Sequence, residues 1–382
     1  MNIKTFFSKA TAVAVSLATI CGSLTATAKP PEILMKKVPS LQTAYKNFQS
    51  VSTDRALVDK YYEEEEKRFL ESGEGVFRLD ASATCDSNVD KLILAIFLNA
   101  INDFFDRYAH IKSALIKISG IFGDYKFTIS CEPCKPIDAG KNLLAVSNGR
   151  PDELGITLNQ GEFNAVSLPY LFENMWDGMS QGIYAGPGDH GSKKIVKKPE
   201  GISTYSLIAY VMHHELGHTS ANIDSAIFLC ESPDQEEFFR NYRDVIIGII
   251  LAHRIEAAEK GELEISPEEF ARISKAYSDL EDDFMGRFPS EAPDVQGILN
   301  TYPTFHQRQM ERIKNEIPSQ NDLFGYPIYS FLSTTSEKSP SEYIAEIVAH
   351  AMVTGDKPTI NSRSALTWLD ALNKKCEQFV KS

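Results

Sequence analysis

The sequence predicts an α+β fold in which a small sheet is joined to a mostly helical C-terminal half. Apolar residues recur at helical spacing through residues 88–119, which indicates one long helix before the sheet. Short apolar runs bounded by turn residues follow, and they indicate strands between residues 125 and 159. After residue 203 the apolar positions keep helical spacing almost to the C-terminus. Together these three observations predict the fold class.

Residues 1–28 have the pattern of a signal peptide. Two lysines precede small and apolar residues at 10–20, and residues 26–28 form an Ala-x-Ala cleavage site. A buried first helix is one alternative. Cys21 raises a lipoprotein alternative, but Ile20 stands where a lipobox has a small residue. We therefore expect an exported protein, either secreted or periplasmic.

The composition argues against two kinds of partner. The chain of 382 residues has a formal net charge of −13, whereas nucleic-acid binding needs a basic face. After residue 28 no stretch approaches the ~18 apolar residues of a membrane-spanning helix. We expect neither a nucleic-acid partner nor an integral membrane segment after signal cleavage. A chain of this length can bury a large core in one or two domains. The composition does not distinguish a monomer from an oligomer.

The elements of the N-terminal half can be assigned in order. Residues 29–86 are interpreted as an N-terminal extension with a helix at 54–70, whose acidic run Glu63–Glu66 is expected to face solvent. Residues 178–199, rich in Gly, Pro and Lys, indicate a loop or a hairpin. The strand-like runs are separated by turn residues, and they cover residues 125–130, 143–147 and 155–159.

The C-terminal half is assigned with the sheet to one domain, residues 87–382, and begins with a helix at 203–220. Ser266 starts a capping box with proline at the first helical position, so a helix is expected to begin there. Residues 232–320 are interpreted as a helical insertion. The further helices are expected at residues 232–260, 266–288, 304–317, 341–353 and 362–380.

Five cysteines remain after signal cleavage, and export makes disulfides possible. Cys131 and Cys134 form a CxxC pair. This pair is weak evidence for a redox or zinc site without a thioredoxin-like context or a second CxxC. We expect a structural bridge, either within the pair or to Cys85. The odd number leaves at least one thiol unpaired in a monomer.

Residues 214–218 form an HExxH motif, His-Glu-Leu-Gly-His. On a helix, positions i and i+4 lie on the same face, so His214 and His218 can aim both imidazoles at one point. Two neutral imidazoles suit Zn²⁺, and Glu215 can act as the general base that deprotonates a water. A chance match is the alternative, but the helical spacing of the flanking apolar residues favours a site. His213 points ~100° away and is expected to pack or to support a ligand.

A catalytic zinc site needs a third protein ligand, and the sequence offers three alternatives. Asp224 has the spacing of a metzincin third ligand, but Ala221 occupies the position where that pattern has glycine. Glu236 or Glu237 fits the short spacing of thermolysin-type enzymes. Glu342 is the strongest candidate.

Glu342 and Glu346 stand at i and i+4 on one face of a predicted helix whose other face is apolar. Two stacked carboxylates repel one another unless a cation is near. A metal that binds Glu342 removes the repulsion, with Glu346 engaging the free N–H of a ligand histidine. The alternative is a capping box from Ser339 to Glu342, which requires no metal.

The HExxH motif, followed far downstream by a Glu-Tyr-Ile-Ala-Glu run that starts at Glu342, resembles the gluzincin arrangement of the anthrax lethal factor and Pro-Pro endopeptidase group. The resemblance covers only these two helices. It implies a zincin-like fold and one zinc ion held by His214, His218 and Glu342. It also implies that Glu215 is the base and that Glu346 supports a ligand. The interval between the motifs is longer than the family usually shows, which implies a helical insertion.

The same family implies a tyrosine that stabilises the oxyanion, shortly before the ligand glutamate. Thr335 stands there in this chain. Tyr329 or Tyr326 could take this role, although packing is the ordinary use of both. Three other histidines are expected to be structural: His253, His306 and His350.

These motifs predict an exported zinc-dependent endopeptidase whose peptide or protein substrate binds along a sheet edge as an added strand. Zinc would activate a water, and Glu215 would move its proton as the peptide bond is hydrolysed. One alternative is a secreted, non-catalytic binding protein on the same scaffold. Glu215 argues against it, because a structural zinc site is usually closed by four protein ligands and needs no base. A cell-wall peptide hydrolase is a further alternative.

Overall fold

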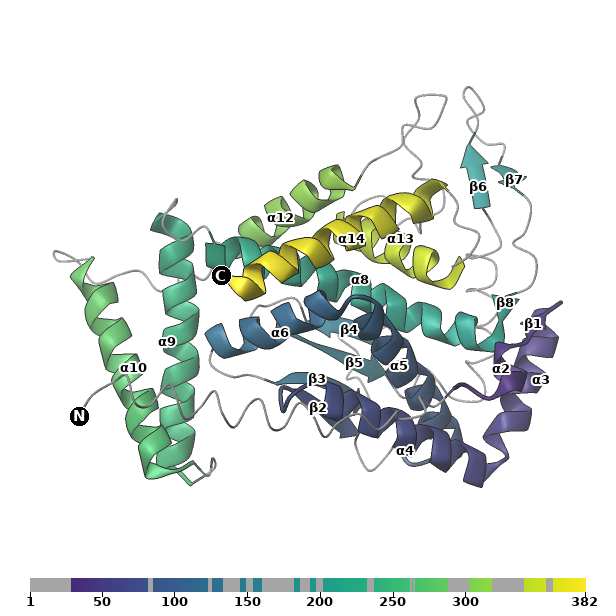
Figure 1. Ribbon diagram of the computed structural model, residues 1–382, viewed down its shortest axis with the longest axis horizontal. Coiled ribbons are helices and arrows are strands. Elements are labelled where there is room, and N and C mark those ends of the chain that lie inside the picture. The colour runs from purple at the N-terminus through teal and green to yellow at the C-terminus, as the bar shows by residue number, and fades with distance from the viewer. Residues whose placement is uncertain are drawn as a thin grey trace, which may run out of the picture.

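The computed structural model has the α+β fold that the sequence predicts (Figure 1). Helices predominate, and one small sheet contains three parallel strands. The structure describes residues 29–81, 85–122, 126–132, 145–148, 154–159, 182–185, 193–196, 202–231, 237–261, 263, 265–287, 302–317, 340–354 and 360–382.

The main sheet has four strands in the order β2-β3-β5-β4. β2 (Phe77–Ala81), β3 (Phe127–Glu132) and β5 (Gly155–Asn159) run parallel, whereas β4 (Ala145–Asn148) is antiparallel to β5 and forms one edge. The sequence predicts the last three strands to within about two residues but does not predict β2. That strand buries Phe77 and exposes most of its other residues, so it carries little apolar signal.

Two helices, α5 (Asn88–Arg107) and α6 (Ala109–Ile121), replace the single helix predicted for 88–119. The break is at Tyr108, whose φ of −116° and ψ of 59° are not helical. The side-chain oxygen of Asn373 accepts hydrogen bonds from two backbone N–H groups at the start of α6, at 3.0 and 3.2 Å. The Asn373 oxygen thus caps the N-terminus of α6, where the side chain of Tyr108 forms no capping hydrogen bond. This partner lies near the C-terminus, so the local sequence gives no sign of the break.

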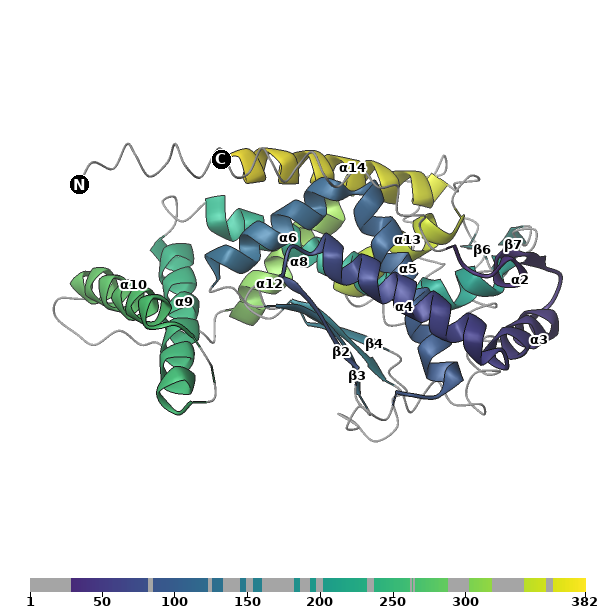
Figure 2. The ribbon, with the colours of Figure 1, turned by 60° about the horizontal axis from the view of Figure 1, so that its bottom comes forward.

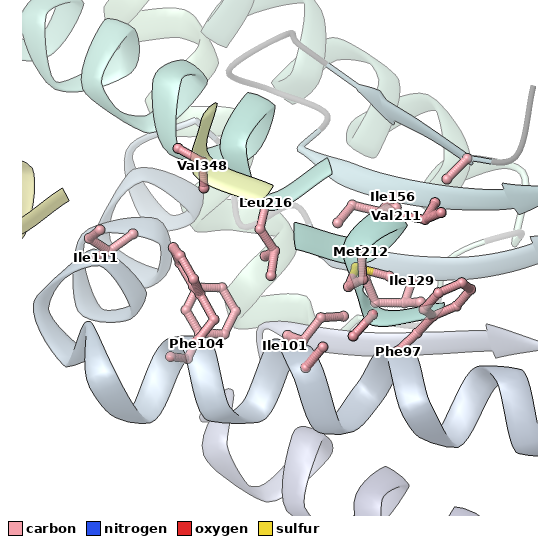
Figure 3. Close-up of a cluster of buried hydrophobic side chains, with 14 of the residues drawn as sticks. Phe97, Ile101, Phe104, Ile111, Ile129, Ile156, Val211, Met212, Leu216 and Val348 are labelled. Carbon is pink, nitrogen blue, oxygen red and sulfur yellow. The ribbon is translucent and has the colours of Figure 1, made fainter. Parts of the chain in front are cut away.

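The helix that carries the HExxH motif, α8 (Thr204–Glu231), continues well beyond the predicted 203–220, and most of its residues are buried. The helix therefore lies in the interior of the protein, and it buries polar as well as apolar side chains. Figure 3 shows its side chains between α5 and the sheet. The labelled core residues are Phe97, Ile101 and Phe104 from α5, Ile111 from α6, Ile129 and Ile156 from the sheet, Val211, Met212 and Leu216 from α8, and Val348 from α13.

The N-terminal segment packs against the start of α8. β1 pairs with β8, the short strand that leads directly into α8. Leu34 and Phe48 of this segment are buried in the same core as α5 and α8. The helix predicted for 54–70 is present as α4. The elements are α2 (Glu32–Met35), β1 (Lys37–Val38), α3 (Leu41–Ser52), α4 (Arg55–Ser72) and β8 (Ile202–Ser203).

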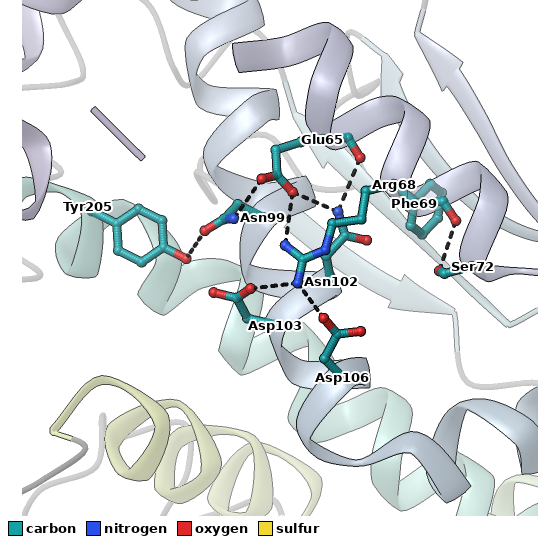
Figure 4. Close-up of polar contacts among 9 residues, drawn as sticks. All are labelled: Glu65, Arg68, Phe69, Ser72, Asn99, Asn102, Asp103, Asp106 and Tyr205. Atoms are coloured by element: carbon teal, nitrogen blue, oxygen red, sulfur yellow. Dashed lines mark hydrogen bonds and ion pairs between the residues drawn. The ribbon is translucent and has the colours of Figure 1, made fainter. Parts of the chain in front are cut away.

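One carboxylate of α4 is buried, in contrast to the solvent-facing acidic run that the sequence predicts. Glu65 has no exposed surface, and its oxygens accept hydrogen bonds from the amides of Asn99 and Asn102, each at 2.8 Å (Figure 4). Arg68 Nη1 lies 3.4 Å from the same carboxylate, and Tyr205 of α8 donates to Asn99 Oδ1. A buried carboxylate is tolerated when it is paired and hydrogen-bonded. Most of these partners lie on other helices, so the local pattern could not predict the burial.

A separate hairpin precedes α8. β6 (Gly182–Ala185) pairs antiparallel with β7 (Lys193–Val196). Of the two interpretations of residues 178–199, the residues that the structure describes there support the hairpin.

After residue 236 every described element is a helix. α9 and α10 pack on each other and project from the rest of the molecule (Figure 2). Ser266 caps α10 by accepting a hydrogen bond from the backbone of Glu269, as its capping box predicts. Among the described residues, no helix is both long and apolar enough to cross a bilayer. The helices are α9 (Glu237–Glu259), α10 (Pro267–Gly286), α12 (Tyr302–Glu316), α13 (Pro340–Thr354) and α14 (Ile360–Lys381).

Cys85 and Cys131 form a disulfide, which is the second of the two expected arrangements, a bridge from the CxxC pair to Cys85. It ties the segment before α5 to the end of β3. Cys134 lies outside the described residues. Cys230 and Cys376 have free thiols, and burial raises the pKa of each to about 12.

Candidate metal centre

α8 and α13 approach each other closely at the HExxH motif. A β-carbon placed on Gly217 would lie 2.7 Å from Ala345 Cα and 3.2 Å from Val348 Cβ. Carbon atoms in ordinary contact are ≈3.5–4.0 Å apart, so a larger residue would displace one of the helices. The glycine of the motif therefore allows the ligand-bearing faces of the two helices to meet.

Three potential ligands converge where these helices meet. His214 Nε2 lies 3.3 Å from Glu342 Oε2, His218 Nε2 lies 3.6 Å from Glu342 Oε1, and the two Nε2 atoms are 3.2 Å apart. A tetrahedral zinc ion with bonds of ~2.0–2.1 Å places its donors about 3.3 Å from one another. The spacing of the donor atoms therefore fits one zinc ion, and all three side chains are half-buried.

His218 also contacts α13 through its second ring nitrogen. Its Nδ1 lies 2.8 Å from the hydroxyl oxygen of Ser341, the residue before Glu342. Ser341 is not among the site residues that the sequence predicts. Its position next to Glu342 is the one signal that could have identified it.

Glu215 is buried between α8 and the edge strand β4. It is 5% exposed, and its carboxylate accepts a hydrogen bond from the backbone N–H of Ser147 in β4. The hydroxyl of Ser147 lies 3.3 Å from that of Thr219, one turn after Glu215. Burial raises the pKa of Glu215 to about 7, although the nearby His214 acts in the opposite direction. A carboxyl that titrates near neutral pH suits a group that must accept and then donate a proton.

The electrostatic environment favours the metal-binding forms of His218 and Glu342, whereas it favours protonation of His214. Burial, followed by the charge of His214, lowers the pKa of His218 to about 3. Burial also acts to lower the pKa of His214, but the hydrogen bond to Glu342 and nearby carboxylate charges outweigh it and raise that pKa. The hydrogen bond with His214 lowers the pKa of Glu342. At neutral pH His218 is neutral and Glu342 is ionised, which are the forms that bind metals.

Asp224, the metzincin-like alternative, is engaged by two cations. Its carboxylate is buried, and its oxygens lie 2.6 Å from Arg312 Nη2 and 2.6 Å from Lys375 Nζ. Among the described residues, the one cluster that could hold a metal contains Glu342 and does not contain Asp224. The structure therefore favours Glu342 over Asp224 as the third ligand.

Glu346 lies one turn after Glu342 on α13 and is half-buried. Its charge acts to raise the pKa of His214, against the effect of burial. This electrostatic contact is compatible with the supporting role predicted for Glu346.

The other histidines near the helix pair have features of packed residues. His306 Nε2 lies 3.1 Å from Asn222 Oδ1, an atom that only accepts, so His306 donates. Burial lowers the pKa values of His306 and His350, and it lowers that of His213 to about 4. The remaining sequence candidates lie outside the described residues: Tyr326, Tyr329, Thr335, Glu236, and the side chains of Glu237 and His253.

Comparison of the chain with family models, with curated proteins and with solved structures finds no match. The assignment of this centre therefore depends on its geometry and chemistry.

Proposed function

We propose that the chain is an exported zinc-dependent endopeptidase with a zincin-like arrangement of its site. The observation that carries this proposal is the convergence of His214, His218 and Glu342 beside a buried carboxylate, Glu215. Three ligands leave a fourth position for water or substrate, which distinguishes a catalytic zinc site from a closed structural one. The disulfide between Cys85 and Cys131 is compatible with an exported protein.

In the proposed reaction, His214, His218 and Glu342 would hold the ion, which would supply Lewis acidity. Glu215 accepts the proton of the attacking water on its carboxylate. It then delivers this proton to the nitrogen of the departing amine. The hydrogen bond from Ser147 fixes the Glu215 carboxylate while it performs both steps.

The edge strand β4 is the proposed place for the substrate. Within the described residues it ends the sheet order, so one of its edges has no strand partner there. An extended peptide could pair with that edge by backbone hydrogen bonds. Since Ser147 of β4 bonds to Glu215, a peptide on this strand would lie next to the general base.

Metal analysis combined with cleavage of a broad peptide library tests the proposal. The wild type should contain one zinc ion per chain and cleave internal peptide bonds. Glu215→Gln keeps the side-chain shape and all three ligands, so it should keep zinc and lose cleavage by several orders of magnitude. Glu342→Gln replaces an anion by a neutral amide on a dication and should weaken zinc binding.

Each outcome separates this proposal from its alternatives. A zinc-loaded wild type that cleaves no peptide in the library would favour a non-catalytic binding protein. Cleavage confined to cell-wall peptides would favour a cell-wall hydrolase. Undiminished turnover in Glu215→Gln would rule out Glu215 as the base.

A further inference from the structure

We propose that Ser341 positions His218 for metal binding by accepting a hydrogen bond from its Nδ1–H. The inference rests on the proposed zinc site and adds a residue to it. The observation is the 2.8 Å separation of His218 Nδ1 and Ser341 Oγ. On the other side of the same ring, Nε2 faces His214 and Glu342.

The chemistry of imidazole determines the direction of this bond. A neutral imidazole carries one N–H, and only its other nitrogen has a lone pair for a metal. For Nε2 of His218 to be the ligand atom, the proton must be on Nδ1. The Ser341 hydroxyl can accept that proton's hydrogen bond, because a hydroxyl has two lone pairs. When it accepts this hydrogen bond, Ser341 stabilises the tautomer that binds metal and restricts rotation of the ring.

The position of Ser341 couples the two helices. It precedes Glu342 in the first turn of α13, so one turn of one helix supplies both a ligand and the support for a second ligand on α8. Ligand histidines more often have a carboxylate or a backbone carbonyl as this support. A hydroxyl carries no charge, so it orients His218 and adds no negative charge to the site.

The first test measures zinc affinity by chelator competition in three serine variants. Ser341→Ala should weaken zinc binding by roughly 10–100-fold, the usual effect of removing such a support. Ser341→Thr keeps the hydroxyl and should restore most of the affinity. Ser220→Ala is the matched control. Its hydroxyl is buried on the same helix as His218, but it donates to the Leu216 carbonyl and should leave zinc affinity unchanged.

The second test needs no metal. In metal-free protein, ¹⁵N NMR of the imidazole should show His218 protonated at Nδ1, with the signal assigned by its loss in His218→Gln. Ser341→Ala should raise the population of the Nε2–H tautomer. Protonation of His218 at Nε2 in the wild type would overturn the inference. Equal zinc affinities of the wild type and Ser341→Ala would also overturn it. If the wild type binds no zinc but shows the Nδ1–H tautomer and its shift in Ser341→Ala, the proposed function fails and the Ser341–His218 bond stands.

Discussion

Gly217 offers a direct test of how the two ligand-bearing helices meet. Replacing it with alanine adds one carbon, which would lie 2.7 Å from Ala345 Cα and 3.1 Å from the Ala345 carbonyl oxygen. The shortfall from an ordinary carbon–carbon contact is about 1 Å. Both of these neighbours are backbone atoms, so the contact can be relieved only by moving a helix.

The expected effects follow from that displacement. Overpacking lowers the free energy of unfolding by roughly 1–3 kcal/mol, whereas the helix propensity of alanine over glycine raises it by ~1 kcal/mol. We therefore expect Gly217→Ala to lower the free energy of unfolding by up to about 2 kcal/mol. Zinc binding should suffer more. Metal–ligand distances tolerate about 0.2 Å, so a shift of α13 by about 1 Å moves Glu342 out of range. We expect Gly217→Ala to weaken zinc affinity at least about tenfold, which corresponds to about 1.4 kcal/mol.

Chelator competition and urea unfolding would measure these two effects, with Gly248→Ala as the control. A β-carbon on Gly248, in the middle of α9, would have its nearest contact with Leu280 Cδ2 at an ordinary 3.7 Å. That variant should gain up to ~1 kcal/mol of stability and bind zinc normally. If Gly217→Ala gains the same stability and keeps wild-type zinc affinity, the close approach of α8 and α13 is refuted.

Three further predictions concern interactions away from the zinc ligands. Asp224→Asn removes the anion that pairs with two partly exposed cations, so it should lower the free energy of unfolding in urea by up to about 3 kcal/mol. The variant should keep its zinc, and loss of zinc from the folded variant would contradict the assignment of Glu342 as a ligand. Burial, against its hydrogen bonds to two asparagines and the charge of Arg68, raises the pKa of Glu65 above its ordinary 4.5. The stability due to this shift is therefore present below about pH 4.5 and is lost as the pH rises through the folded-state pKa. The difference in unfolding free energy between the wild type and Glu65→Gln should narrow as the pH rises above about 4.5, and a difference that stays constant with pH would exclude the shift. Cys131→Ser removes the disulfide that closes a loop spanning 46 positions, so the unfolded chain gains conformational entropy. The free energy of unfolding under oxidising conditions should fall by roughly 4 kcal/mol, and equal stability of variant and wild type would exclude the bridge to Cys85.

The sequence predicts those helices, strands and site residues whose signals are short-range periodic patterns. Positions i and i+4 of a helix determine that His214 and His218 face one point, and the paired carboxylates of the second helix identify Glu342. The structure places Glu342 beside both histidines. Three strands and the C-terminal helices are likewise predicted, because each has its own apolar pattern and end signals.

The features that the sequence does not predict depend on partners far along the chain. The break at Tyr108 is capped by Asn373, and the burial of Glu65 depends on amides of α5. The contact between Ser341 and His218 joins residues 123 positions apart. Only the folded arrangement of the helices brings these groups together, so no local pattern indicates them.

The division of the ligands between α8 and α13 has a consequence for a chain that is still being synthesised. A nascent chain that ends before residue 340 contains both histidines and Glu215 but not the helix that supplies Glu342 and Ser341. Closing a loop of more than a hundred residues is entropically costly and comes late in folding. The proposed hydrolytic activity would therefore appear only after synthesis has passed α13 and this helix has docked. A fragment truncated before it would keep the recognisable HExxH motif without the complete centre.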